Sequence, residues 1–359
     1  LKFSSEKCHL PPGDMGWPLV GNMFFFFQCF KDGNLRSFAS YFSNRFGPGG
    51  MYKAFTFGKP TIIVTRPETS RKIFMDNGET FDRGMPSYIL KIIGQDEVGG
   101  VSRQEMRLLH GLTTPIKSSL SVSSNYIDCV NETVKSSFEK LAAMKEPVDI
   151  LSAVKRPVFD VFIEILIGGG VHQELLDVLF DKTVFLFRGC HGLPINIPGF
   201  AYNKAIKARR EIVKIFQQIL DERKLMMGKK KAVEKSNNIL DIMLNSQVDD
   251  DEGGRFSDEE IIIVLVAYTF AGFEPVAVAA SRTIMYLAKH PHFLQKAKEE
   301  QEEIVKRRSS PDAGLTFGEI GQMKYVNNVI NETLRQGSTE TVLFRDARTD
   351  VNIKGYTIP

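Results

Sequence analysis

An apolar run, IIIVLVAYTFAGFEPVAVAA from Ile261 to Ala280, constrains the fold of this chain more than any other feature. Hydropathy makes it a candidate membrane span, which needs about 20 apolar residues. A carboxylate, Glu274, and a helix-breaking proline, Pro275, argue against a span, as does the polar segment before the run. A helix that is apolar on all sides can equally lie at the centre of a large soluble protein. We therefore favour a buried central helix.

Capping residues mark where this helix begins. Ser257 with Glu260 forms an S-x-x-E capping box directly before the apolar run, and Thr316 with Glu319 repeats the pattern later in the chain. The sequence therefore predicts a central helix over residues 257–290 and a second helix start near Thr316.

The remaining pattern predicts a mainly α fold with small β-sheets. Aromatic and β-branched runs around Gly58-Lys59-Pro60 indicate a hairpin within residues 50–68. Apolar residues at helical spacing in ARREIVKIFQQILDERKLMM indicate a long amphipathic helix. Two charged stretches within residues 225–256 are interpreted as solvated loops.

Charge and cysteine usage exclude several classes of protein. The net charge of +3 gives no electrostatic footprint for nucleic acid, so no nucleic-acid partner is expected. The four cysteines, Cys8, Cys29, Cys129 and Cys190, are scattered without a C-x-x-C pair, and the histidines show no metal-ligand spacing. Reduced thiols are expected, and Cys190, in a glycine-rich turn, is interpreted as structural.

Small residues beside a carboxylate make the middle of the central helix a candidate site. Ala271 and Gly272 let another group approach the helix backbone, and Glu274 follows within one turn. One interpretation is a place where a ligand lies against the helix and protons are handled. The other is a packing glycine, with the carboxylate paired to a distant arginine or lysine. The residues alone leave both open.

Four motifs together resemble the cytochromes P450. AGFE resembles the [AG]-G-x-[DE]-[TS] segment of the oxygen-binding helix, and NETLR supplies E-x-x-R in a helix expected over residues 326–336. FRDARTDVNIKGYTIP is similar to the strand region that follows, and LPPGDMGWPLVGN to a proline-rich hinge, which we assign to residues 1–22. Their order implies a single cytochrome P450 domain over residues 1–359.

Within that family the chain is most similar to plant ent-kaurenoic acid oxidases, on segments such as PPGDMGWPLVGNM and FLQKAKEEQEEIVKRR. The resemblance implies haem-thiolate oxidation of a diterpene acid in gibberellin biosynthesis, with haem b as cofactor. It also implies electrons from NADPH–cytochrome P450 reductase, at the cytosolic face of the endoplasmic reticulum, through an N-terminal anchor not present here. The β-amyrin 11-oxidases are similar too, so a triterpene substrate is the alternative.

The resemblance also assigns roles to individual residues of the central helix and of the E-x-x-R motif. Ala271 and Gly272 would leave room for dioxygen, and Glu274 would belong to a proton relay. Glu332 and Arg335 would form a buried, structural ion pair. Without the other motifs, that pair would be read as an ordinary surface pair at i,i+3 spacing.

Two further residues are implied as contacts of the haem propionates. Arg345 would reach one propionate through a charge-assisted hydrogen bond. His110 stands where the family normally presents an arginine, and it could donate one hydrogen bond.

With His110, three departures bear on activity, and the other two are as follows. The family's cysteine loop lies beyond Pro359, so the chain is expected to be C-terminally incomplete, and none of its cysteines can be named as the iron ligand. Pro275 replaces the hydroxyl residue that follows the acid, and its side chain can neither donate nor accept a hydrogen bond. We expect this chain to bind no haem as a thiolate complex and to be inactive as it stands, with part of the central helix uncovered.

Two alternatives come from other classes of protein. The first is a haem-free gene product that is retained as a folding or binding module or is simply non-functional. The second is a helical bundle that binds a protein partner without any ligand.

Overall fold

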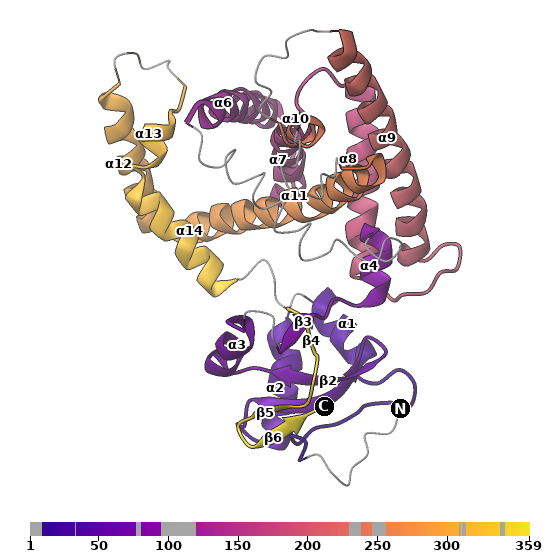
Figure 1. Ribbon diagram of the computed structural model, residues 1–359. Coiled ribbons are helices and arrows are strands. Elements are labelled where there is room, and N and C mark those ends of the chain that lie inside the picture. The colour runs from indigo at the N-terminus through magenta and orange to yellow at the C-terminus, as the bar shows by residue number, and fades with distance from the viewer. Residues whose placement is uncertain are drawn as a thin grey trace.

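The computed structural model divides into a large helical lobe and a smaller lobe that contains the strands (Figure 1). It describes residues 9–32, 34–76, 80–94, 120–229, 238–245, 256–308, 310, 314–337 and 342–359. Both ends of the described chain lie in the smaller lobe (Figure 1).

The helical lobe is built around α11, which crosses it and packs along α7, while α8 and α9 pack side by side (Figure 1). Its helices are α4 (Ser87–Ile93), α6 (Leu120–Ala143), α7 (Ile150–Ile167), α8 (Gln173–Cys190), α9 (Ala201–Lys229), α10 (Ile239–Asn245), α11 (Asp258–Lys289), α12 (Pro291–Lys306), α13 (Phe317–Ile320) and α14 (Lys324–Gln336).

The smaller lobe joins the two ends of the sequence through short antiparallel sheets. Strand β3 near the start pairs with β4 near the end, with Phe81 opposite Ala347. The elements are α1 (Met23–Lys31), α2 (Leu35–Phe46), β1 (Met51–Thr56), β2 (Lys59–Val64), α3 (Pro67–Phe74), β3 (Phe81–Arg83), β4 (Arg345–Ala347), β5 (Val351–Ile353) and β6 (Tyr356–Ile358).

The predicted hairpin is confirmed as β1 and β2, which pair from Met51 opposite Val64 to Thr56 opposite Lys59. Its turn places both Phe57 (φ 55°) and Gly58 (φ 76°) in the left-handed region, as two-residue hairpin turns of type I′ require. The strain at Phe57 is offset by packing, because its ring contacts residues of both hydrophobic cores.

Each lobe has its own hydrophobic core. The core of the helical lobe includes Phe159, Phe216 and Phe273, all of which are fully buried. The core of the smaller lobe contains Phe42 and Tyr52. Phe57 packs against both cores, so the hairpin tip helps to hold the lobes together.

Both predicted capping boxes are confirmed. Ser257 Oγ accepts a hydrogen bond from the Glu260 amide at 3.2 Å, and the Glu260 carboxylate accepts one from the Ser257 amide at 2.7 Å. Thr316 and Glu319 make the same two bonds, at 3.3 and 2.7 Å. These caps satisfy amide groups that a helix start otherwise leaves unpaired. Helix α11 therefore begins where the sequence places it.

The prediction that residues 225–256 are loops is partly wrong. Helix α9 continues to Lys229, and α10 forms within the stretch. Ile239, Leu240 and Met243 of α10 are buried in the core, which stabilises a helix too short to show periodicity in the sequence. The other predicted loop residues, 230–237 and 246–255, lie outside the described residues.

Among the described residues, α11 is the one helix long and apolar enough to cross a membrane. Half of its apolar segment (50%) is buried inside the protein, and α7, α8, α9 and α14 contact it. Those contacts fit the predicted central helix of a folded domain.

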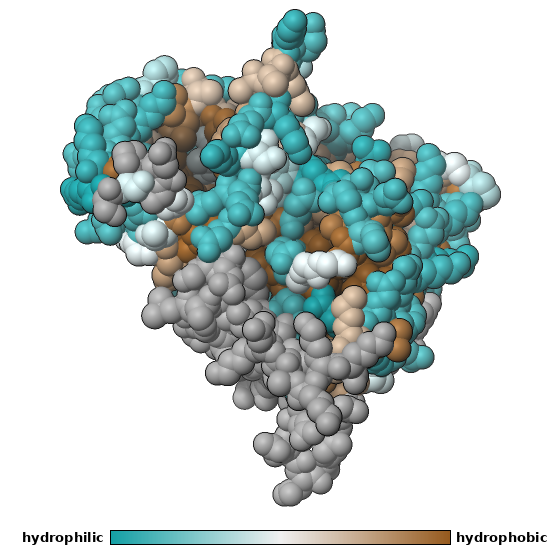
Figure 2. Space-filling model, turned by 90° about the horizontal axis from the view of Figure 1, so that it is seen from above, coloured by the Kyte–Doolittle hydropathy of each residue, from teal (hydrophilic) through white to brown (hydrophobic). Residues whose placement is uncertain are grey.

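Part of the apolar surface of α11 is uncovered, as expected from the sequence. Val276 is 54% exposed, and Ile284 and Met285 are 40% and 39% exposed. Seen from above, the helical lobe also shows apolar surface in recesses bordered by polar side chains (Figure 2).

Candidate functional site

Phe273 fixes the candidate site in the helical lobe. Its side chain is fully buried, and its ring centroid lies 5.3 Å from that of Phe159 and 5.7 Å from that of Phe187. Because Phe273 points into the core, its neighbours on α11 point elsewhere, and Ala271 is exposed. The burial of Phe273 in the core therefore places Ala271 on the exposed side of α11.

Helix α11 runs through Pro275 without a break and continues to Lys289. Proline has no amide hydrogen, so residue 275 cannot donate the usual helical hydrogen bond to the Ala271 carbonyl. The packing of α11 on its neighbours therefore outweighs the cost of the proline.

Gly272 of α11 lies against the ring of Phe162 on α7. A Cβ atom at this position would lie 2.0 Å from Cε2 and 2.1 Å from Cζ of Phe162. Real Cβ atoms essentially never come so close to another atom, so the glycine makes room for an aromatic ring. This contact matches the packing-glycine interpretation, and Ala271 presents the exposed side of the helix.

Glu274 forms an ion pair with Lys155 of α7, with 2.6 Å between Oε1 and Nζ. The side chains are 18% and 21% exposed, respectively. The second carboxylate oxygen, Oε2, is buried and has no hydrogen-bond partner among the described residues. The sequence left a distant arginine or lysine open as the partner of Glu274 but could not name it, because no motif marks Lys155.

Glu332 and Arg335 form the predicted pair, but the prediction that it is buried is wrong. Arg335 Nε and Nη2 donate to the two carboxylate oxygens of Glu332 at 2.6 and 2.5 Å. The side chains of Glu332 and Arg335 are 50% and 70% exposed. Helix α14 buries Thr333 and turns these residues outward, so the described geometry is that of a surface i,i+3 pair.

The pair with Arg335 lowers the pKa of Glu332. Hydrogen bonds from Arg335 and then Gln336 lower the pKa of Glu332 from 4.5 to about 2. A carboxyl whose pKa is depressed in the folded state stabilises the fold above its unfolded pKa, and this contribution is lost as the pH falls toward about 2. We expect carboxyl NMR to show Glu332 titrating well below 4.5, and Arg335→Gln to raise its midpoint toward that value. A midpoint near 4.5 in the unmodified chain would contradict the bidentate pair.

Of the two predicted propionate contacts, Arg345 is described, and it is not brought to this site. The Arg345 guanidinium lies 4.6 Å from the ring centroid of Phe74, and Nη1 donates to the Phe344 carbonyl at 2.7 Å. These contacts hold Arg345 in the smaller lobe, whereas Glu274 faces α7 in the helical lobe. His110 lies outside the described residues.

Three of the four cysteines lie among the described residues: Cys29, Cys129 and Cys190. The described residues contain no group of three or more histidine, cysteine or acidic side chains that could hold a metal ion. Cys29 and Cys190 are buried, and burial raises the pKa of the Cys190 thiol to about 12.

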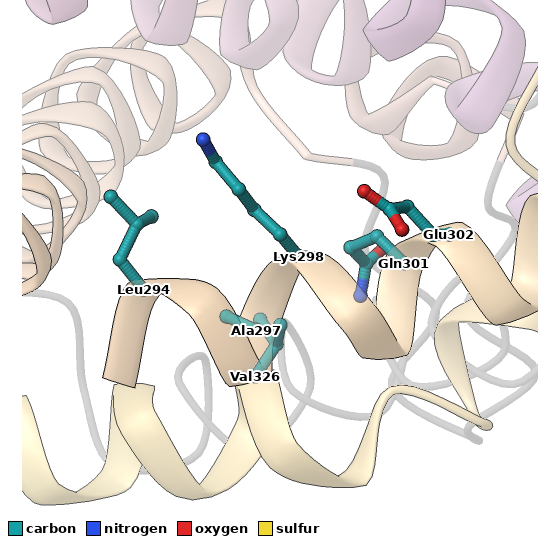
Figure 3. A pocket seen from close by; sticks show the side chains of 6 residues that line it. All are labelled: Leu294, Ala297, Lys298, Gln301, Glu302 and Val326. Carbon is teal, nitrogen blue, oxygen red and sulfur yellow. The ribbon is translucent and has the colours of Figure 1, made fainter. Parts of the chain in front are cut away.

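A shallow recess of about 330 Å³ lies between α12 and α14 (Figure 3). Leu294 and Ala297 of α12 and Val326 of α14 form its apolar part, while Lys298 and Glu302 border it. No residue of the candidate site lines it, so we do not place a substrate there.

Comparisons with known proteins point to one family. The family model described as Cytochrome P450 matches residues 11–359. A 7,8-epoxymelianol synthase from Ailanthus altissima is 38% identical over 99% of this chain and 70% of its own length. A β-amyrin 11-oxidase from Glycyrrhiza uralensis and ent-kaurenoic acid oxidase 2 from Arabidopsis thaliana are each 37% identical, over 100% of this chain and 72% of their own lengths.

A solved structure agrees at the level of the fold. The retinoic acid bound cyanobacterial CYP120A1 superposes with a TM-score of 0.82 over 98% of this chain and 75% of that structure. At 22% identity the likeness concerns the fold alone, and it confirms the predicted mainly α architecture with small sheets.

Proposed function

Because the chain belongs to the cytochrome P450 family, we propose that it derives from a plant haem-thiolate monooxygenase that oxidises a diterpene acid, with ent-kaurenoic acid as the first candidate substrate. Relatives named ent-kaurenoic acid oxidase support this choice. Relatives named β-amyrin 11-oxidase and 7,8-epoxymelianol synthase support the alternative, a triterpenoid substrate.

The geometry of Glu274 is the observation that carries the proposal. A half-buried carboxylate in the central helix has one oxygen bound to Lys155 and one buried oxygen without a partner among the described residues. A polar atom left in this way is costly and calls for an explanation, one of which is a role in handling protons or ligands. Glu274 is therefore suited to accept and release a proton beside Ala271.

The family implies a haem, which supplies oxygen activation when it is bound. We propose haem b, with its axial thiolate contributed by a cysteine other than those described above. Ala271 would face the group from the exposed side of α11, and Glu274 would hold a proton nearby. We retain Arg345 and His110 as proposed propionate contacts, since Arg345 has N–H donors beyond the one that bonds to Phe344.

The partner and location are proposed on the same grounds. Electrons would come from NADPH–cytochrome P450 reductase, and the substrate would be a small hydrophobic terpenoid. The protein would work at the cytosolic face of the endoplasmic reticulum, held by an N-terminal anchor.

A haem-free binding module is the second candidate, and one observation favours it. Pro275 removes the hydroxyl that the family places beside the acid. The carbon monoxide spectrum of the reduced, purified chain tests whether a cysteine of this chain is the axial ligand. We expect no thiolate-type absorption band from residues 1–359 alone, and such a band would show that one of the cysteines in this chain is a ligand.

The substrate is tested in cells that express the protein together with a plant NADPH–cytochrome P450 reductase. Ent-kaurenoic acid and β-amyrin are supplied in parallel cultures, and products are identified by mass spectrometry. In a form of the protein that shows the thiolate-type absorption band, we expect oxidised ent-kaurenoic acid, and a strong loss of product in Glu274→Gln. Oxidation of β-amyrin alone in that form would favour the triterpenoid alternative, and failure of every form to show the band would favour the haem-free module.

A further inference from the structure

We propose that Lys155 is the positioning residue of Glu274: its ammonium group anchors one carboxylate oxygen, so that the other oxygen is the place where a proton is exchanged. The role of that exchange in oxidation rests on the proposed function. The anchoring itself depends only on the ion pair between Lys155 of α7 and Glu274 of α11.

The two oxygens of Glu274 have different surroundings. Oε1 lies 2.6 Å from Lys155 Nζ, which is the distance of a charge-assisted hydrogen bond. Oε2 is buried without a hydrogen-bond partner among the described residues. An anchored oxygen fixes the direction of the carboxylate, and the free oxygen then has a defined position from which to take up a proton.

Helix α7 holds Lys155 in place relative to α11. Phe162 fills the space left by Gly272, and the ring centroids of Phe159 and Phe273 lie 5.3 Å apart. Both contacts join α7 to the segment of α11 that carries Glu274. Since interior packing leaves little freedom to shift, the ammonium group meets the carboxylate in a fixed geometry.

The neighbouring cation does not compete for Glu274. Arg156 Nε donates to Asp160 at 2.7 Å, and Arg156 Nη2 lies 2.6 Å from an oxygen of Asp177 on α8. Arg156 therefore pairs with Asp160 and Asp177, while Lys155 pairs with Glu274 on α11.

Methionine at position 155 would keep an unbranched apolar stem and remove the charge. Glu274 would then be a partly buried carboxylate without a counter-charge, and such a group is neutralised by taking up a proton. Arginine would keep the charge. The two substitutions therefore separate the role of the charge from the role of side-chain packing.

The test is infrared spectroscopy of the full chain near neutral pH, which detects the carbonyl absorption of protonated carboxyl groups. We expect Lys155→Met to add an absorption that shifts when glutamate is isotope-labelled and disappears in the double variant Lys155→Met/Glu274→Gln. The unmodified chain and Lys155→Arg should lack it. This readout does not depend on oxidation, so it stands or falls separately from the substrate assay.

The pair between Lys182 and Glu211 supplies a matched control. It also joins two helices through a lysine and a glutamate, 2.5 Å apart, but the Glu211 side chain is 48% exposed. Lys182→Met should therefore add no such absorption. A folded Lys155→Met chain without the absorption, or the same absorption in Lys182→Met, would overturn the proposal. If Lys155→Met does not fold, Lys155→Gln is measured with the same criteria.

Discussion

Replacing Asp241 with alanine is expected to lower the free energy of unfolding by about 3–5 kcal/mol, because removing one partner of a buried ion pair strands the other charge. The Asp241 side chain is 5% exposed, and its Oδ2 lies 3.0 Å from Nη1 of Arg223, which is 18% exposed. Asp241 Oδ2 also accepts a hydrogen bond from Asn238 at 2.8 Å. Arg223 Nη2 donates to the Ile167 carbonyl at 2.5 Å, so one network joins α7, α9 and α10.

Urea unfolding followed by circular dichroism measures this loss as a lower midpoint with an unchanged slope. Glu303→Ala is the control, because its pair with Arg307 is 3.5 Å long and both side chains are about two-thirds exposed (68% and 70%). Exposed pairs of this kind contribute about 0.2–1 kcal/mol. Equal effects of the two substitutions would show that the network around Asp241 does not hold the three helices together.

Short sequence motifs predict where several helices and the hairpin begin and end, because the hydrogen bonds that fix these boundaries join residues close together in the sequence. The capping boxes at Ser257 and Thr316 and the hairpin near Gly58 each depend on residues a few positions apart. Helix α10 escaped prediction because tertiary burial, which a short sequence window does not show, stabilises it.

The candidate site was predictable only in part. Glu274 stands out in the sequence because a charge in an apolar run is costly. Its partner Lys155 does not stand out, since only the crossing of α7 and α11 brings the two together. The burial expected for Glu332 failed for a related reason: spacing along a helix predicts that two side chains meet, but it does not show what covers them.

Replacing Pro275 with threonine is expected to change both stability and chemistry. Proline in a helix interior costs about 3 kcal/mol relative to alanine and threonine at most about 0.7, so the substitution should raise the free energy of unfolding by about 2 kcal/mol. The new amide can donate to the Ala271 carbonyl, and the hydroxyl can both donate and accept beside Glu274. Urea unfolding measures the first effect. The second is measured as product formed per NADPH consumed, in a haem-loaded form of the protein with its reductase.

Pro157 lies inside α7, two residues after Lys155, and provides the same substitution outside α11. Pro157→Thr should raise stability by a similar amount, about 2 kcal/mol, and leave the ratio of product to NADPH unchanged. General acid–base assistance typically contributes about 100-fold or more, so restoring a hydroxyl beside Glu274 should raise that ratio clearly. If both substitutions stabilise the chain and neither improves the ratio, Pro275 is a helix defect only, and its side chain does not replace a working member of the proton relay.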